Sequence, residues 1–191
     1  MLHIIDTSMS VAEQGLSFSV EEKIQNVEAG EALCKGVVDT LEKLKLKKED
    51  FKKKGPKGVI RAHAKVVDAL RDAWDETDGF GTGASFEYER VTHGIDFVGR
   101  GPHDRIAVAV EVDRLRRPTR SWIKLSDIRA KVKVWVYITP ESIDRAEWEF
   151  KEAIKAFRRL LKHRRESMED YGKLLAILKT PTHFYHEEVK W

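Results

Sequence analysis

Residues 94–113 read GIDFVGRGPHDRIAVAVEVD, and residues 132–138 read VKVWVYI. The first stretch contains two apolar segments, 95–98 and 105–113, separated by a turn that is rich in glycine. Their β-branched residues predict strands, and the short turn predicts an antiparallel hairpin. Such a hairpin brings Asp96, at the start of its first strand, beside Glu111 and Asp113 at the end of its second.

Alternation along residues 105–113 assigns the side chains of this strand to two faces. The prediction places Ile106, Val108, Val110 and Val112 on one face, and Ala107, Ala109, Glu111 and Asp113 on the other. The small alanines leave the acidic face open. Three carboxylates that meet at one point repel each other unless a cation neutralises them, and hard oxygen ligands suit Mg²⁺ or Mn²⁺.

Hydrophobic periodicity predicts further elements on both sides of the hairpin. In chain order we expect a helix from Val20 to about Leu46, a charged loop at 47–57, a helix from about Pro56 to Asp78, and strands at 85–92, 95–98 and 105–113. A helix at 119–129, a strand at 132–139 and a long helix that opens at 140–142 and runs to about Ser167 follow. Gly30 and Gly36 are candidate breaks in the first helix. The apolar run Leu174–Leu178 has an ambiguous period.

From residue 57 onward, this order of helix, three strands, helix and strand resembles the restriction-endonuclease-like nucleases, which are known by their PD-(D/E)XK signature. The resemblance covers about residues 57–165 and implies an α/β fold with an αβββαβ core. It implies that Asp96 and Glu111 bind Mg²⁺ or Mn²⁺, that the main-chain carbonyl of Val112 completes the set, and that Asp113 is a candidate third ligand.

One position departs from the family pattern, because Asp113 stands where the signature lysine is expected. In some members the lysine has moved to the following helix, and Lys124 is then the first candidate for this catalytic role, with Lys131 second. Glu87 and Glu89 are candidate outer ligands. An acid at a strand end also has a structural interpretation, in which Glu111 and Asp113 only pair with nearby arginines.

Basic residues follow the acidic pair directly. The candidates for nucleic-acid contacts are Arg114, Arg116, Arg117, Arg120 and Lys124, because arginine binds phosphate bidentately. Arg158, Arg159, Lys162, Arg164 and Arg165 have two interpretations, since they can contact DNA or complement the helix C-terminus. The lysines of the 47–57 loop likewise have two interpretations, since they can contact phosphate or form a solvated charged surface.

Weaker signals have structural interpretations. Gly79–Gly83 follows a helix, whereas a phosphate-binding glycine loop precedes one, so we interpret it as a helix C-cap and connector. His183, His186 and Glu187 lack the spacing of a zinc site. Cys34 on an apolar helix face is expected in the core.

Composition limits the class of protein. The chain has 191 residues, 41% hydrophobic and 35% charged, with a formal net charge of +3. We expect a single domain over 1–191, with an N-terminal helical extension (1–56), a nuclease-like core (57–165) and a C-terminal tail (166–191). The lone cysteine and the lack of a signal or membrane-spanning stretch predict a cytoplasmic protein without a membrane partner. The chain has only three side-chain amides, Gln14, Gln25 and Asn26. Such depletion of thermolabile amides is typical of proteins from thermophiles.

The sequence therefore predicts a metal-dependent nuclease that acts on DNA, with a homodimer as the natural form if the substrate is duplex. Two alternatives remain open. In the first, the fold is catalytically inactive and serves as a nucleic-acid- or protein-binding module. In the second, the chain is an α+β interaction protein with neither metal nor nucleic-acid affinity.

Overall fold

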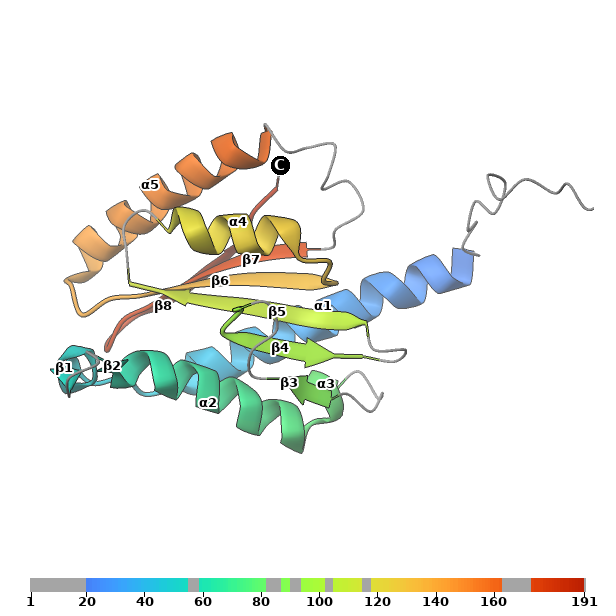
Figure 1. Ribbon diagram of the computed structural model, residues 1–191, viewed down its shortest axis with the longest axis horizontal. Coiled ribbons are helices and arrows are strands. Elements are labelled where there is room, and N and C mark those ends of the chain that lie inside the picture. The colour runs from blue at the N-terminus through green and yellow to red at the C-terminus, as the bar shows by residue number, and fades with distance from the viewer. Residues whose placement is uncertain are drawn as a thin grey trace, which may run out of the picture.

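The computed structural model describes residues 20–54, 59–81, 87–89, 94–101, 105–114, 118–162 and 173–190. A six-stranded sheet in the order β3-β4-β5-β6-β7-β8 lies between two layers of helices (Figure 1). The strands are β3 (Glu87–Glu89), β4 (Phe97–Arg100), β5 (Ile106–Asp113), β6 (Val132–Ile138), β7 (Lys173–Lys179) and β8 (Phe184–Glu188). The helices are α1 (Val20–Lys43), η2 (Lys48–Phe51), α2 (Arg61–Glu76), α3 (Asp78–Gly81), α4 (Thr119–Asp127) and α5 (Ile143–Lys162), and a small hairpin pairs β1 (Lys53–Lys54) with β2 (Val59–Ile60).

Strand direction divides the sheet. β3 pairs with β4, and β4 with β5, in antiparallel fashion. β5, β6 and β7 are mutually parallel, and β8 runs antiparallel to β7. The sheet is therefore mixed, and the predicted α/β class is confirmed. The predicted hairpin is confirmed by the register that pairs Phe97 with Val110. The helix and the strand expected after it are found as α4 and β6.

The C-terminal tail contributes two strands. Residues 174–178 are all buried in β7, whose two faces are both covered. A strand buried on both faces is apolar throughout, so it shows no alternation, which explains why its period was ambiguous in the sequence.

The structure corrects three expectations about the elements. Val59 and Ile60 form β2, so the second helix begins at Arg61. α1 runs unbroken past Gly30 and Gly36 and ends at Lys43. A register shift beside Gly99 leaves Ala107 on the face of Val108 and Ile106 on the opposite face, so the predicted alternation holds only from Val108 onward.

Each face of the sheet has its own apolar cluster. α1 and α2 cover Val108, Val110 and Val112, together with alternate residues of β6 and β7. α4 and α5 cover Ala109 and the aromatic side chains of β6. On this second face, the Trp135 ring stacks on the Phe150 ring, with centroids 5.6 Å apart. Among the described residues, no helix is both long and apolar enough to cross a bilayer.

A left-handed turn at Asp78–Gly81 joins α2 to the segment before β3. Asp78, Gly79, Phe80 and Gly81 all have positive φ, between 45° and 77°. The turn inserts Phe80 between helices, where its side chain contacts Gly36 and meets the Trp74 ring edge-on at 4.8 Å. Only glycine at position 36 leaves room for this ring. The Gly79–Gly83 motif is thus a structural C-cap as far as it is described.

We predict that Phe80→Ala lowers the free energy of unfolding by about 3–5 kcal/mol, because it removes a buried ring and leaves a cavity beside Trp74. Urea denaturation followed by circular dichroism measures this change. Val27→Ala, at an α1 position that is 55% exposed, is the matched control and should change stability by under about 0.5 kcal/mol. Equal losses of stability in both variants would contradict the packing role of Phe80 between Gly36 and Trp74.

Candidate functional site

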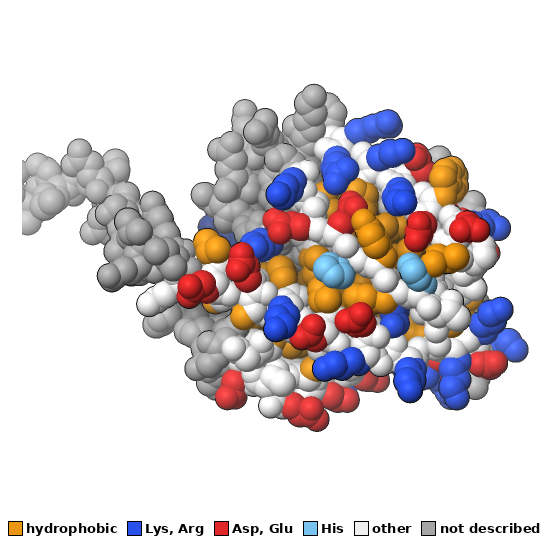
Figure 2. Space-filling model, turned by 180° about the vertical axis from the view of Figure 1, so that it is seen from behind, with side chains coloured by type: hydrophobic (Ala, Val, Ile, Leu, Met, Phe, Trp, Pro, Cys, Tyr) orange, Lys and Arg blue, Asp and Glu red, His pale blue; other side chains and the backbone are white. Residues whose placement is uncertain are grey.

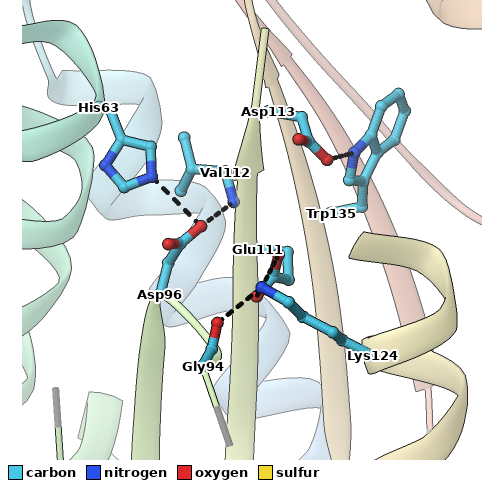
Figure 3. A network of polar contacts seen from close by, with 8 residues as sticks. All are labelled: His63, Gly94, Asp96, Glu111, Val112, Asp113, Lys124 and Trp135. Atoms are coloured by element: carbon cyan, nitrogen blue, oxygen red, sulfur yellow. Dashed lines mark hydrogen bonds and ion pairs between the residues drawn. The ribbon is translucent and has the colours of Figure 1, made fainter. Parts of the chain in front are cut away.

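The amino end of β4 and the carboxyl end of β5 meet at one edge of the sheet (Figure 3). Because Phe97 pairs with Val110, Asp96 lies next to Glu111 and Val112. The parallel register of β5 and β6 places Glu111 beside Trp135 and Asp113 beside Tyr137. The predicted approach of Asp96 to the end of the partner strand is therefore found.

Asp96 is held by two donors on a single oxygen. Its Oδ2 accepts the Val112 backbone N–H at 2.8 Å and lies 3.2 Å from His63 Nε2. His63 comes from α2, on the other side of the sheet from α4. Hydrogen bonding to Asp96 raises the pKa of His63, and the charges of Glu111 and Asp113 add to this effect while burial opposes it.

Glu111 is almost fully buried and is bound by Lys124. The ammonium of Lys124 lies 3.0 Å from Oε1 and 3.2 Å from Oε2 of this carboxylate, and it also donates to the Gly94 carbonyl at 2.6 Å. Burial raises the pKa of Glu111, and the charge of Asp96 raises it further, although hydrogen bonds from Lys124 and Ser121 act in the opposite direction. The hydrogen bonds from Lys124 and Ser121 therefore offset only part of the cost of burying this carboxylate beside Asp96, and its pKa is raised overall.

Asp113 is turned toward β6. Its Oδ2 accepts the indole N–H of Trp135 at 3.0 Å, and Ser121 at the start of α4 also hydrogen-bonds to it. Burial raises the pKa of Asp113, while these two hydrogen bonds lower it. Figure 3 shows Asp113 directed at the Trp135 indole, away from Asp96. Asp113 contributes negative charge to the site, but its carboxylate is hydrogen-bonded to Trp135 and Ser121 on the face that α4 and α5 cover.

The arrangement offers two carboxylates, not three, to a cation. Among the described residues no group of three or more His, Cys, Asp or Glu side chains is placed to hold a metal ion. Mg²⁺ is commonly held by one or two carboxylates, with water and substrate filling its remaining positions. In an antiparallel pair one residue directs both its N–H and its C=O to the same neighbour, so the Val112 carbonyl is on the Asp96 side. Asp96, Glu111 and this carbonyl are hard oxygen donors, the chemical type that such an ion takes.

The other predicted residues are spread more widely. Arg114 is half-buried and lines a shallow pocket with Tyr137, Thr139 and Glu149, and Arg120 is exposed on α4. Arg116 and Arg117 lie outside the described residues. Lys131 is at the opposite end of β5, since its N–H bonds to the Ile106 carbonyl.

Two sets of weaker candidates are separate from the site. Glu87 and Glu89 are on β3, two strands away from β5, and their side chains are outside the described part. Of the residues considered for zinc, His183 lies 3.6 Å from Glu147 and Glu187 lies 3.4 Å from Arg158, so both face α5.

Sequence reasoning missed two residues of the network, His63 and Ser121. His63 lies in a helix that shows no local motif, and only the packing of α2 against the sheet brings it to Asp96. Ser121 reads as an ordinary helix-start residue. Their contacts arise between segments far apart in the chain, so no spacing in the sequence could have indicated them.

No protein-family model matches the chain, and comparisons with curated proteins and with solved structures find no match either. The functional argument therefore depends on the geometry of these residues.

We predict that the stability of Glu111→Gln relative to the wild type increases as the pH rises from 4.5 through the raised folded pKa of Glu111. A carboxyl group whose folded pKa lies above its ordinary 4.5 contributes stability below that value and loses it as pH rises through the folded pKa. Glutamine does not titrate, so the variant avoids this loss. Urea denaturation at several pH values measures the difference in unfolding free energy.

Asp50→Asn is the contrasting control. Burial would raise the pKa of Asp50, but the Lys65 ammonium at 2.7 Å and the Lys47 N–H lower it overall. Its contribution is present above the unfolded pKa and is lost as pH falls, so this variant should lose more stability as pH rises. Parallel pH curves for the two variants would contradict the opposite environments of the two carboxylates.

Proposed function

We propose that this protein is a divalent-metal-dependent nuclease that hydrolyses phosphodiester bonds in DNA. The observation that carries the proposal is the placement of Asp96 and Glu111 at one sheet edge, with the Lys124 ammonium 3.0 Å from Glu111. We further propose that the core is restriction-endonuclease-like. The element order α2, β3, β4, β5, α4, β6 supports this, because it is the αβββαβ order expected of that family.

In the proposed centre, Asp96, Glu111 and the Val112 carbonyl hold Mg²⁺ or Mn²⁺. The raised pKa of Glu111 supports the fit, because a cation would relieve the desolvation and the repulsion from Asp96 that cause the shift. When bound, the metal lowers the pKa of an attacking water and neutralises charge on the phosphate. His63 orients Asp96 by donating to Oδ2.

Lys124 takes the role of the family's signature lysine in this proposal. It extends from α4, and Glu111 and the Gly94 carbonyl hold its ammonium at the edge of the carboxylate pair. From there it can orient a water or donate to a phosphate oxygen, which stabilises charge that develops during hydrolysis. Asp113 stands at the lysine's usual position and, held by Trp135, adds negative charge next to the centre.

The arginines that follow β5 are proposed to hold the nucleic-acid backbone on either side of the scissile bond. Arg114 directly follows Asp113 at the end of β5, and Arg120 directly precedes Ser121, which hydrogen-bonds to Asp113. Arg116 and Arg117 belong to the same sequence run. If the substrate is duplex, a homodimer supplies one centre for each strand.

One contact favours a second function, that of a binding module without catalysis. Lys124 already compensates part of the charge of Glu111, so the edge has a cation of its own in the absence of metal. In that case, the carboxylates serve to position α4, and the surface binds nucleic acid or protein without cleaving it.

Titration with Mn²⁺, followed by calorimetry and by melting temperature, separates these functions. We predict saturable binding to the wild type that Asp96→Asn and Glu111→Gln abolish. Asp72→Asn, at an α2 position that is 61% exposed, is the matched control and should bind normally. Titrations of wild type and Glu111→Gln that are both featureless would refute the nuclease proposal and leave the binding module.

We predict that Lys124→Met retains Mn²⁺ binding but lowers the rate of DNA cleavage by about 10²-fold or more, because it removes a donor that acts on the developing charge. A gel assay with supercoiled and linear substrates measures the rate. Lys131→Met serves as the control, since this lysine is at the far end of β5. Cleavage at the wild-type rate by Lys124→Met would eliminate Lys124 from the mechanism.

A further inference from the structure

The outer face of α5 carries an exposed tryptophan. The Trp148 side chain is 62% exposed, whereas Trp74, Trp122 and Trp135 are at most 3% exposed. No described element lies over the outer side of α5 in Figure 1. A single exposed apolar side chain is common on protein surfaces, so Trp148 indicates a binding surface only together with the charged side chains that lie beside it on the same face of α5.

Cations continue this face toward the C-terminal end of α5. Lys151, Lys155 and Arg159 follow Trp148 at spacings of three, seven and eleven residues, which places them on one side of the helix. Lys151 and Lys155 are 58% and 61% exposed, and Arg159 is exposed. The line from Trp148 to Arg159 spans roughly 16 Å at the helical rise per residue.

The charge along α5 is asymmetric. Asp144 and Glu147 lie before Trp148 together with Arg145, which pairs with Glu141 and Glu149. Glu152 is the single acid among the exposed α5 residues after Trp148 that the structure describes. Lys151 contacts Glu147 at 3.5 Å and Lys155 contacts Glu152 at 2.6 Å, and such exposed ion pairs contribute little to stability. Figure 2 shows several Lys and Arg side chains along the upper rim of the molecule, where α5 lies.

We infer that this face of α5 binds a single-stranded segment of nucleic acid, with one base stacked on Trp148 and the backbone along Lys151, Lys155 and Arg159. Aromatic stacking beside a row of cations is how proteins bind single strands without sequence preference, because every base has a π-face. The inference rests on the proposed function for the class of partner. To the proposed nuclease function, the inference adds that the nucleic-acid substrate contains a single-stranded segment.

The position of α5 connects this surface to the candidate site. α5 begins five residues after β6 ends, at the sheet edge where Tyr137 is in register with Asp113. A strand that runs along α5 toward its N-terminus therefore approaches the edge that holds the carboxylates.

Fluorescence anisotropy tests the inference in EDTA, where neither metal nor cleavage contributes. The probes are fluorescein-labelled dT16 and a 16-base-pair duplex of unrelated sequence, each titrated at several salt concentrations. We expect the wild type to bind dT16 more tightly than the duplex. Trp148→Ala should weaken dT16 binding about tenfold, and Trp148→Phe should restore most of it, because phenylalanine still stacks.

The triple variant Lys151→Gln, Lys155→Gln, Arg159→Gln should reduce the slope of log K against log salt by about two, the value for three lost phosphate contacts on a single strand. Two matched controls lie on α1 or within two residues of its end, and both should bind as the wild type does. They are Val27→Ala, which truncates another exposed apolar side chain, and the triple variant Lys35→Gln, Lys43→Gln, Lys45→Gln at exposed lysines.

Several results would overturn the inference. They are unchanged dT16 affinity in Trp148→Ala, equal losses in the α1 controls, or no dT16 binding by the wild type. Size-exclusion chromatography gives a further result that would overturn the inference. If the wild type is a dimer, and Trp148→Ala is a monomer with unchanged dT16 affinity, a second copy of the chain covers α5. The dT16 titrations contain EDTA and the Mn²⁺ titrations contain no nucleic acid, so failure of the metal centre and failure of the α5 surface are distinguishable.

Discussion

The hydrogen-bonded pairing of β4 with β5 is the constraint on which the candidate site depends. It fixes Asp96 against the Val112 N–H and so brings a second carboxylate to the buried Glu111. A shift of this register by one residue would turn Glu111 into the apolar cluster under α1 and α2. The packing of Trp74 over Gly99 supports the register, because a side chain at position 99 would collide with the indole.

The network around these acids links both helix layers. α2 supplies His63 to Asp96, and α4 supplies Lys124 to Glu111 and Ser121 to Asp113. A buried carboxylate is costly without partners, and each of the three has at least one donor. Burial is the main cause of the raised pKa of Glu111 and Asp113, and the charge of Asp96 adds to it. A bound cation would offset both effects by stabilising the charged form, which is the physical reason a cation is proposed to bind there.

Function in this chain is proposed to be divided between the sheet edge and a helix surface. The edge is small, partly buried and chemically specific, as hydrolysis requires. The outer face of α5 is exposed, and stacking on an aromatic ring accepts any base, as binding of a flexible strand of any sequence requires. The two surfaces meet where β6 ends and α5 begins, so one strand of nucleic acid can reach both.

The sequence by itself determined the hairpin, the α/β class and the approach of Asp96 to Glu111, because these follow from alternation and a short turn between neighbouring segments. It also indicated Lys124, one helix later. The tertiary structure decided the rest: β7 and β8, the turning of Asp113 to Trp135, and the arrival of His63 and Ser121. Strands buried on both faces lack a period, and contacts between distant segments depend on packing, so neither leaves a local signal in the sequence.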